Sequence, residues 1–98
     1  MARTAVQRCV EERLAACGNI IPQVESIYRW EGKVETAGEV LVILKTTGTA
    51  YEALEAKLRS LHPYEVPEII ATPLSHGSAA YLDWVRDSCA PGYSNSSS

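Results

Sequence analysis

The feature that constrains this fold most is a pair of long extended runs joined by a short glycine-containing turn. Residues 19–30 are rich in β-branched and aromatic side chains, and a second extended run continues to about Thr46. Between them lies Glu-Gly-Lys at residues 31–33. Pro22 cannot donate a ladder hydrogen bond, so we expect it at an edge or a bulge. The pattern predicts a long β-hairpin whose tip projects beyond the body, with residues 40–44 as its best-buried segment.

Helical patterns flank this hairpin in the sequence. Apolar side chains at steps of three and four predict a helix over residues 3–17, with Gly18 as its left-handed stop. A Thr-x-x-Glu capping box predicts a second helix over residues 49–62, which the following proline ends. A short strand is predicted over residues 66–72 and a closing helix over residues 78–88.

The predicted order is therefore helix, strand, strand, helix, strand, helix. This is the β-α-β-β-α-β order of a ferredoxin-like sandwich without its first strand and with a helix added at the C-terminal end. The expected fold class is α+β, an antiparallel sheet with helices on one face. The 98 residues fit one domain over residues 1–90. The Ser-rich residues 91–98 are expected to be a disordered tail.

Charge and hydropathy argue against two classes of partner. Nine Lys and Arg against twelve Asp and Glu give a net charge of -3, with no clustered basic surface for nucleic acid. The longest strictly apolar run, residues 40–44, is far below the ~20 residues that cross a bilayer. No signal-peptide pattern opens the chain. We therefore expect a cytoplasmic protein without nucleic-acid or membrane partners.

The three cysteines, Cys9, Cys17 and Cys89, have neither disulfide nor zinc-site spacing. Buried, inert thiols are the favoured interpretation. Cys17 belongs to the apolar stripe of the first predicted helix, so core packing is favoured there over a functional thiol.

Three blocks of the sequence resemble the CutA family of divalent-cation tolerance proteins. They are residues 12–22 (ERLAACGNIIP), 26–33 (SIYRWEGK) and 62–70 (HPYEVPEII). Residues 39–46 and 81–84 also look like family positions, so the resemblance extends over residues 3–88. It implies a ferredoxin-like subunit in a tight homotrimer, in which long hairpins pair with the neighbours' strands. It also implies a link to copper and other divalent cations and no defined catalytic activity.

The chain departs from the family pattern in two ways. Family members usually have a strand before the first helix, whereas here Met1 lies almost where that helix begins. The copper ligands that the resemblance implies are a cysteine on that strand and two adjacent histidines before a proline. Here that pair reads Leu61-His62, so His62 is the candidate metal ligand. A helix-terminal structural role for His62 is the favoured alternative. The Ala-Ala-Cys block of the family makes Cys17 the candidate functional thiol.

A further group of residues is expected at a ligand cleft between subunits or at the subunit interface itself. Aromatic walls with opposite charges suit a small polar ligand, while aromatic anchors are equally typical of interfaces. The group consists of Tyr28, Trp30, Lys33, Tyr64, Glu65 and Pro67.

The leading function hypothesis is a non-enzymatic, trimeric protein of divalent-cation (copper) tolerance or response. The alternatives are a trimeric small-ligand signalling module like the PII regulators, or a purely structural scaffold. A PII-like role would call for a glycine-rich phosphate cradle, which this sequence lacks. An enzyme is disfavoured because no Ser-His-Asp or Cys-His pattern is present.

Overall fold

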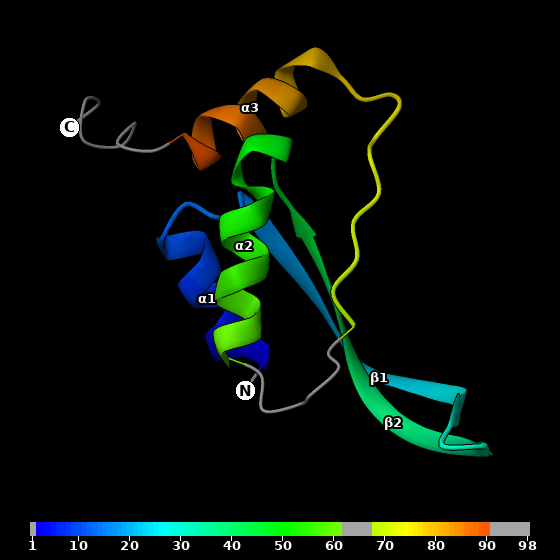
Figure 1. Ribbon diagram of the computed structural model, residues 1–98. Coiled ribbons are helices and arrows are strands. Elements are labelled where there is room, and N and C mark those ends of the chain that lie inside the picture. Colours follow the sequence, from blue (N-terminus) through cyan, green and yellow to red (C-terminus); the bar gives the residue numbers. More distant parts are fainter. Residues whose placement is uncertain (1, 62–67, 91–98) are drawn as a thin grey trace.

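The computed structural model describes residues 2–61 and 68–90. Two helices, α1 (Ala2–Glu11) and α2 (Gly48–Leu61), lie side by side and form a layer on the hairpin of β1 (Cys17–Trp30) and β2 (Lys33–Lys45) (Figure 1). The third helix, α3 (Ala79–Cys89), lies at the end of the hairpin where β1 begins and β2 ends. We call this end the head, and residues 24–39, which extend beyond the helices, the arm. The α+β class is confirmed.

The hairpin has the register that its turn requires. Trp30 pairs with Lys33 across a two-residue loop, and both loop residues have positive φ, 51° at Glu31 and 80° at Gly32. This is the type I′ geometry whose twist matches that of the strands. The pairing shifts between Ile21 and Val24, so two residues of β1 oppose one of β2. Pro22 lies in this bulge, as predicted.

The first helix ends earlier than its apolar stripe predicts. Its last residue is Glu11, and Arg13 takes the left-handed conformation at φ 63°. The Leu14 amide donates to the Cys9 carbonyl at 2.9 Å and the Arg13 amide to the Val10 carbonyl at 3.1 Å, which is the Schellman pattern of a helix C-terminus. The predicted end at residue 17 and the stop at Gly18 are therefore wrong.

Gly18 has another role, because it lies inside β1 where α1 approaches the sheet. A Cβ at Gly18 would lie 2.5 Å from Val6 Cγ1 and 2.8 Å from Leu44 Cδ2. Only glycine lets the helix come this close. The contact also shows that the side of the ribbon bearing Gly18 and Leu44 faces α1.

Side-chain hydrogen bonds cap the N-terminal ends of α2 and α3. The Ala50 amide donates to Thr47 Oγ1 at 3.1 Å, so Thr47 caps α2 and the predicted capping box at Thr49 is wrong. The Tyr81 amide donates to Ser78 Oγ at 3.3 Å, which begins α3 one residue after the predicted start.

The core of the single chain is small and lies at the head. The buried hydrophobic residues of the described chain are Val6, Cys9, Ala15, Ala16, Leu54, Val85 and Cys89. Cys9 is fully buried, and its thiol pKa is raised mainly by that burial. The prediction of buried thiols is confirmed for Cys9 and Cys89. Residues 40–44 are not fully buried in the single chain, because Val40, Leu41 and Ile43 are nearly half exposed.

The predicted strand over residues 66–72 is not formed in its described part, residues 68–72. In the ferredoxin-like order this strand pairs with the first strand of the sheet, and the described chain supplies no such neighbour. A strand without a ladder partner has no source of inter-strand hydrogen bonds. Residues 68–77 run as an irregular segment alongside the body instead, with Ile70 and Leu74 strongly exposed (Figure 1).

The molecule is elongated for its length. Its radius of gyration is 15.4 Å and its extents are 52 × 29 × 22 Å. A compact domain of about 100 residues has a radius of gyration of about 13 Å. The excess comes from the arm, which projects away from the helices (Figure 1).

Candidate functional site

One side of the hairpin is left uncovered by α1 and α2, and we call it the open face. Residues directly opposite each other in an antiparallel pair share a face, as do alternate residues along a strand. The side opposite Gly18 and Leu44 therefore bears, at the head, Cys17, Asn19, Ile21, Leu41, Ile43 and Lys45. Ile21, Leu41 and Ile43 are 40–45% exposed there.

The open face continues without interruption along β2 into the arm. Glu39, Glu35 and Lys33 follow Leu41 at alternate positions, and Tyr28 and Trp30 lie opposite Glu35 and Lys33. Tyr28 is 41% and Trp30 48% exposed. Three residues of the predicted cleft or interface, Tyr28, Trp30 and Lys33, thus lie together at the tip of one face.

Cys17 lies at the head end of the same face, far from the tip. Thirteen residue steps separate it from Trp30, which is roughly 40 Å along a strand. The Cys17 thiol is half-buried, and its Sγ lies 4.0 Å from the hydroxyl oxygen of Tyr81 on α3. The partial burial of Tyr81 raises the pKa of its phenol, and the hydrogen bond with Cys17 raises it further. The predicted helical position of Cys17 is wrong, because Cys17 begins β1, where it is half-buried.

The remaining predicted site residues lie outside the described part of the chain. They are His62, Tyr64, Glu65 and Pro67. Within residues 2–61 and 68–90 no group of three or more His, Cys, Asp or Glu side chains gathers in a way that could hold a metal ion. His76 lies in the loop before α3, with its Nδ1 3.0 Å from Ser75 Oγ. The described residues of one chain therefore do not form a copper site by themselves.

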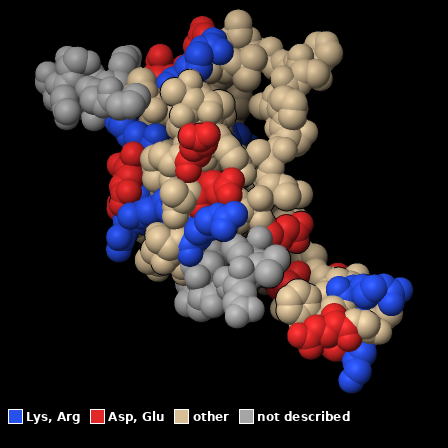
Figure 2. All heavy atoms as spheres, viewed as in Figure 1, with Lys and Arg blue, Asp and Glu red and all other residues tan. Residues whose placement is uncertain are grey.

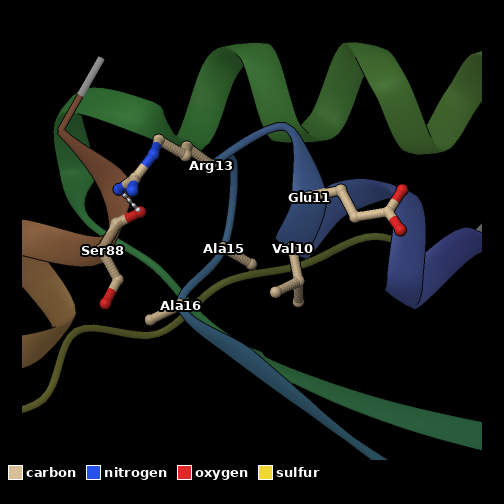
Figure 3. A pocket seen from close by; sticks show the side chains of 6 residues that line it. All are labelled: Val10, Glu11, Arg13, Ala15, Ala16 and Ser88. Atoms are coloured by element: carbon tan, nitrogen blue, oxygen red, sulfur yellow. Dashed lines mark hydrogen bonds between the residues drawn. The ribbon is translucent and has the colours of Figure 1, made fainter. Parts of the chain in front are cut away.

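A shallow depression of about 380 Å³ lies on the helix side of the head (Figure 3). Val10, Ala15 and Ala16 give it an apolar floor, and Arg13 points across it toward Ser88. The Arg13 guanidinium donates to the carbonyl oxygens of Asp87 at 3.3 Å and Ser88 at 3.0 Å. A cation at the C-terminal carbonyls of a helix stabilises that helix end. We therefore interpret this depression as a structural junction between α1 and α3.

Two more hydrogen bonds hold the segment after α1 against the end of β2. Thr46 Oγ1 donates to the Leu14 carbonyl at 2.6 Å, and the Ala16 amide donates to the Lys45 carbonyl at 2.7 Å. The head is thus held by bonds between segments far apart in the sequence.

Charge is distributed unevenly between the two sides of the molecule. Lys, Arg, Asp and Glu gather on the outer surface of α1 and α2, where Lys57 Nζ lies 3.0 Å from Glu12 Oε2 (Figure 2). The arm tip carries charges of both signs. At the head, by contrast, Lys45 is the one charged residue of the open face. The helix layer is a solvated surface, whereas the open face resembles an interface.

Sequence reasoning did not single out Lys45, and it named Tyr81 only as a family position. The sequence did contain a signal for Lys45. Alternate residues of a strand share a face, so Lys45 lies on the same face as the apolar Leu41 and Ile43. The position of Tyr81 relative to Cys17 depends on how α3 packs, which no local pattern records.

The fold and this surface define a small α+β protein with a helix layer on one side of a long hairpin and an apolar open face on the other. None of the helices in the described ranges is long and apolar enough to cross a membrane. The family model of the CutA1 divalent ion tolerance protein matches residues 1–88. The chain belongs to the CutA1 family.

Relatives and solved structures agree with this assignment. The divalent-cation tolerance protein CutA of Thermus thermophilus is 51% identical over 87 residues, which cover 89% of this chain and 84% of that protein. The human protein CutA is 50% identical over 86 residues, 88% of this chain but only 48% of its own length. The solved Thermus thermophilus structure superposes with a TM-score of 0.88 at 49% identity, covering 91% of this chain and 86% of that one.

A structure described as the PII-like protein CutA from a Nostoc species, in apo form, is also similar. Its TM-score is 0.83 at 31% identity, and the match covers 90% of this chain and 86% of that one.

Proposed function

We propose that this chain functions as a non-catalytic homotrimer of the CutA type that serves cytoplasmic tolerance of, or response to, divalent cations, copper among them. The observation that carries the assembly is the open face. Ile21, Leu41 and Ile43 form an apolar strip that is nearly half exposed in one chain. Contiguous apolar surface of this kind marks an interaction site, and unpaired strand edges favour closed assembly.

The arm supports the same proposal. Trp30 and Tyr28 lie at its tip on the open face, and Ile27 and Val34 on its other side are 70% and 65% exposed. Aromatic side chains are frequent anchors at interfaces. A neighbouring copy that receives the arm would cover these residues.

The cation part of the proposal rests on the family assignment and on the names of its relatives. The ligands would come from His62, and from Cys17 or a neighbouring copy, since one imidazole is a poor copper site. Calorimetric titration of the assembled protein with Cu²⁺ tests this, beside His62→Asn and Cys17→Ser. We expect saturable, stoichiometric binding that His62→Asn abolishes. Absence of saturable binding in the parent protein would contradict the cation part and leave the assembly.

A PII-like small-ligand role is the second candidate, favoured by the likeness to the Nostoc protein described as PII-like. In that case Tyr28, Trp30, Lys33, Tyr64, Glu65 and Pro67 would line a cleft between subunits. A thermal-shift screen with nucleotides and organic anions tests this role. A ligand that raises the melting temperature of the parent protein, but not of Lys33→Gln, would favour it over a pure scaffold.

A further inference from the structure

Lys45 is placed unusually for a lysine. It is half-buried at the head of the open face, next to the strip formed by Ile43 and Leu41. Its Nζ donates to Asn19 Oδ1, a neutral acceptor. The ion pairs within the described ranges join Lys57 to Glu12, Arg59 to Glu55 and Arg86 to Asp83, so none of them neutralises Lys45.

A thiol lies across the ladder from this ammonium, and a phenol lies beside the thiol. Cys17 lies directly across the ladder from Lys45, so their Cβ atoms are about 5 Å apart on the same face. The Cys17 thiol is in contact with the Tyr81 hydroxyl, and the Tyr81 ring lies 5.6 Å from that of Trp84, centre to centre. The head of the open face thus presents an ammonium, a thiol and a phenol, with the Trp84 ring beside the phenol.

Assembly changes the electrostatics of this patch, and the inference therefore rests on the proposed trimer. When another copy covers the open face, the Lys45 ammonium loses water. A charge removed from water is tolerated when an opposite charge and hydrogen bonds replace the water. Asn19 supplies a dipole and no charge, so the described part of one chain provides no anion for Lys45.

We propose that the head of the open face is an anion site that is completed on assembly, with Lys45 as its positive pole and the Tyr81 hydroxyl as a second donor. The group it takes is a carboxylate or a phosphate. It comes either from a free small anion or from the arm of a neighbouring copy. The arm carries Glu35 and Glu39 on the same face, and Glu39 Oε1 already accepts from Ser26 Oγ at 2.5 Å.

The test uses four proteins: the parent, Lys45→Gln, Lys45→Arg and Arg8→Gln. Arg8→Gln is the matched control, because it removes the same charge from the exposed surface of α1, away from the open face and the arm. For each protein, light scattering gives the mass over a dilution series. Thermal melts are then compared in inorganic phosphate and in chloride at matched ionic strength.

Two results support the proposal and identify the source of the anion. If the anion is free, phosphate raises the melting temperature of the parent, Lys45→Arg and Arg8→Gln, and this response is lost in Lys45→Gln. If it is a neighbour's carboxylate, phosphate has no specific effect, and Lys45→Gln weakens the trimer on dilution by roughly thirtyfold or more. Lys45→Glu should then be rescued by Glu35→Lys or Glu39→Lys.

Two results overturn the proposal. If the parent is a trimer and Lys45→Gln behaves like Arg8→Gln in both assays, the anion site is absent while the assembly stands. If the parent has the mass of a single chain, the proposed assembly fails and the anion site fails with it.

Discussion

The head and the arm of this molecule differ in how much of their apolar surface the single chain buries. At the head, Cys9, Leu54 and Val85 are buried, and the segment after α1 is bonded to both β2 and α3. In the arm, Ile27, Val34 and Trp30 are 48–70% exposed although the hairpin ladder is complete to its tip. The helices of one chain therefore cover one side of about half of the hairpin. In the proposed assembly, another copy covers the arm and the open face.

The largest effect is expected from a charge in the middle of the open face. Ile43→Glu should dissociate the assembly, because each copy loses the burial of one isoleucine, about 1.5–3 kcal/mol, and would bury a carboxylate instead. In a single chain Ile43 is 45% exposed, so the head should stay folded. Sedimentation velocity and far-UV circular dichroism measure the two effects. Ala56→Glu on the exposed side of α2 is the control, and dissociation by both variants equally would contradict the distinction between the two sides.

A core truncation at the head should do the opposite: it should lower the stability of the fold without changing the particle mass. Leu54 is 3% exposed beneath α2, and Leu54→Ala should lower the free energy of unfolding by about 2–5 kcal/mol. The particle mass under native conditions should stay that of the parent. Urea unfolding followed by circular dichroism gives the first quantity and light scattering the second. An unchanged unfolding midpoint would show that the head is not the stabilising region.

Two glycines allow the head and the arm to be compared by the same substitution. Gly18→Ala places a Cβ 2.5 Å from Val6 Cγ1 and should cost about 1–3 kcal/mol of unfolding free energy. Gly38→Ala in the arm meets no atom within 4 Å and should be close to neutral. Thermal melts test the pair, and Val6→Ala added to Gly18→Ala should recover part of the loss. Equal melting temperatures for the two single variants would contradict the close approach of α1 to the sheet.

The smallest effect is expected in the helix layer, where side-chain pKa values should not change on assembly. The pKa of Glu55 is lowered by the hydrogen bond from Tyr51 and then by Arg59. A lowered folded-state pKa contributes stability above the unfolded pKa and loses it as the pH falls through the folded value. In Tyr51→Phe the pKa of Glu55 should rise toward its ordinary value, as carbon-detected NMR titration can show. A Glu55 pKa that changes on assembly instead would place α2 at the interface.

Local patterns predicted the elements whose signals are local. The short glycine-containing turn at residues 31–33, the edge or bulge position of Pro22 and the start of α3 to within one residue were predicted in this way. The end of α1 was missed because Arg13, not a glycine, takes the left-handed position, and its side chain is held there by the carbonyls of α3. That support comes from a residue 74 positions away.

Two further errors concern predicted strands. The strand predicted over residues 66–72 is not formed in residues 68–72, because the described chain offers it no ladder partner. The apolar residues 40–44 predict a buried strand, and composition alone does not say which chain buries it. In one copy, Val40 stays 49% and Ile70 80% exposed. For the site, the sequence grouped Tyr28 and Trp30 as cleft or interface residues, and the hairpin register places both on one face. The pairing of Cys17 with Tyr81 required knowledge of how α3 packs on the head.

The proposed trimer is tested most directly by the mass of the particle in dilute solution, measured by light scattering together with circular dichroism on the same sample. We predict three times the single-chain mass of 10.7 kDa, with full secondary structure at every concentration that holds this mass. A mass of one chain with unchanged circular dichroism and a cooperative melt would contradict the proposed trimer, because the chain would then be stably folded with its open face exposed to water.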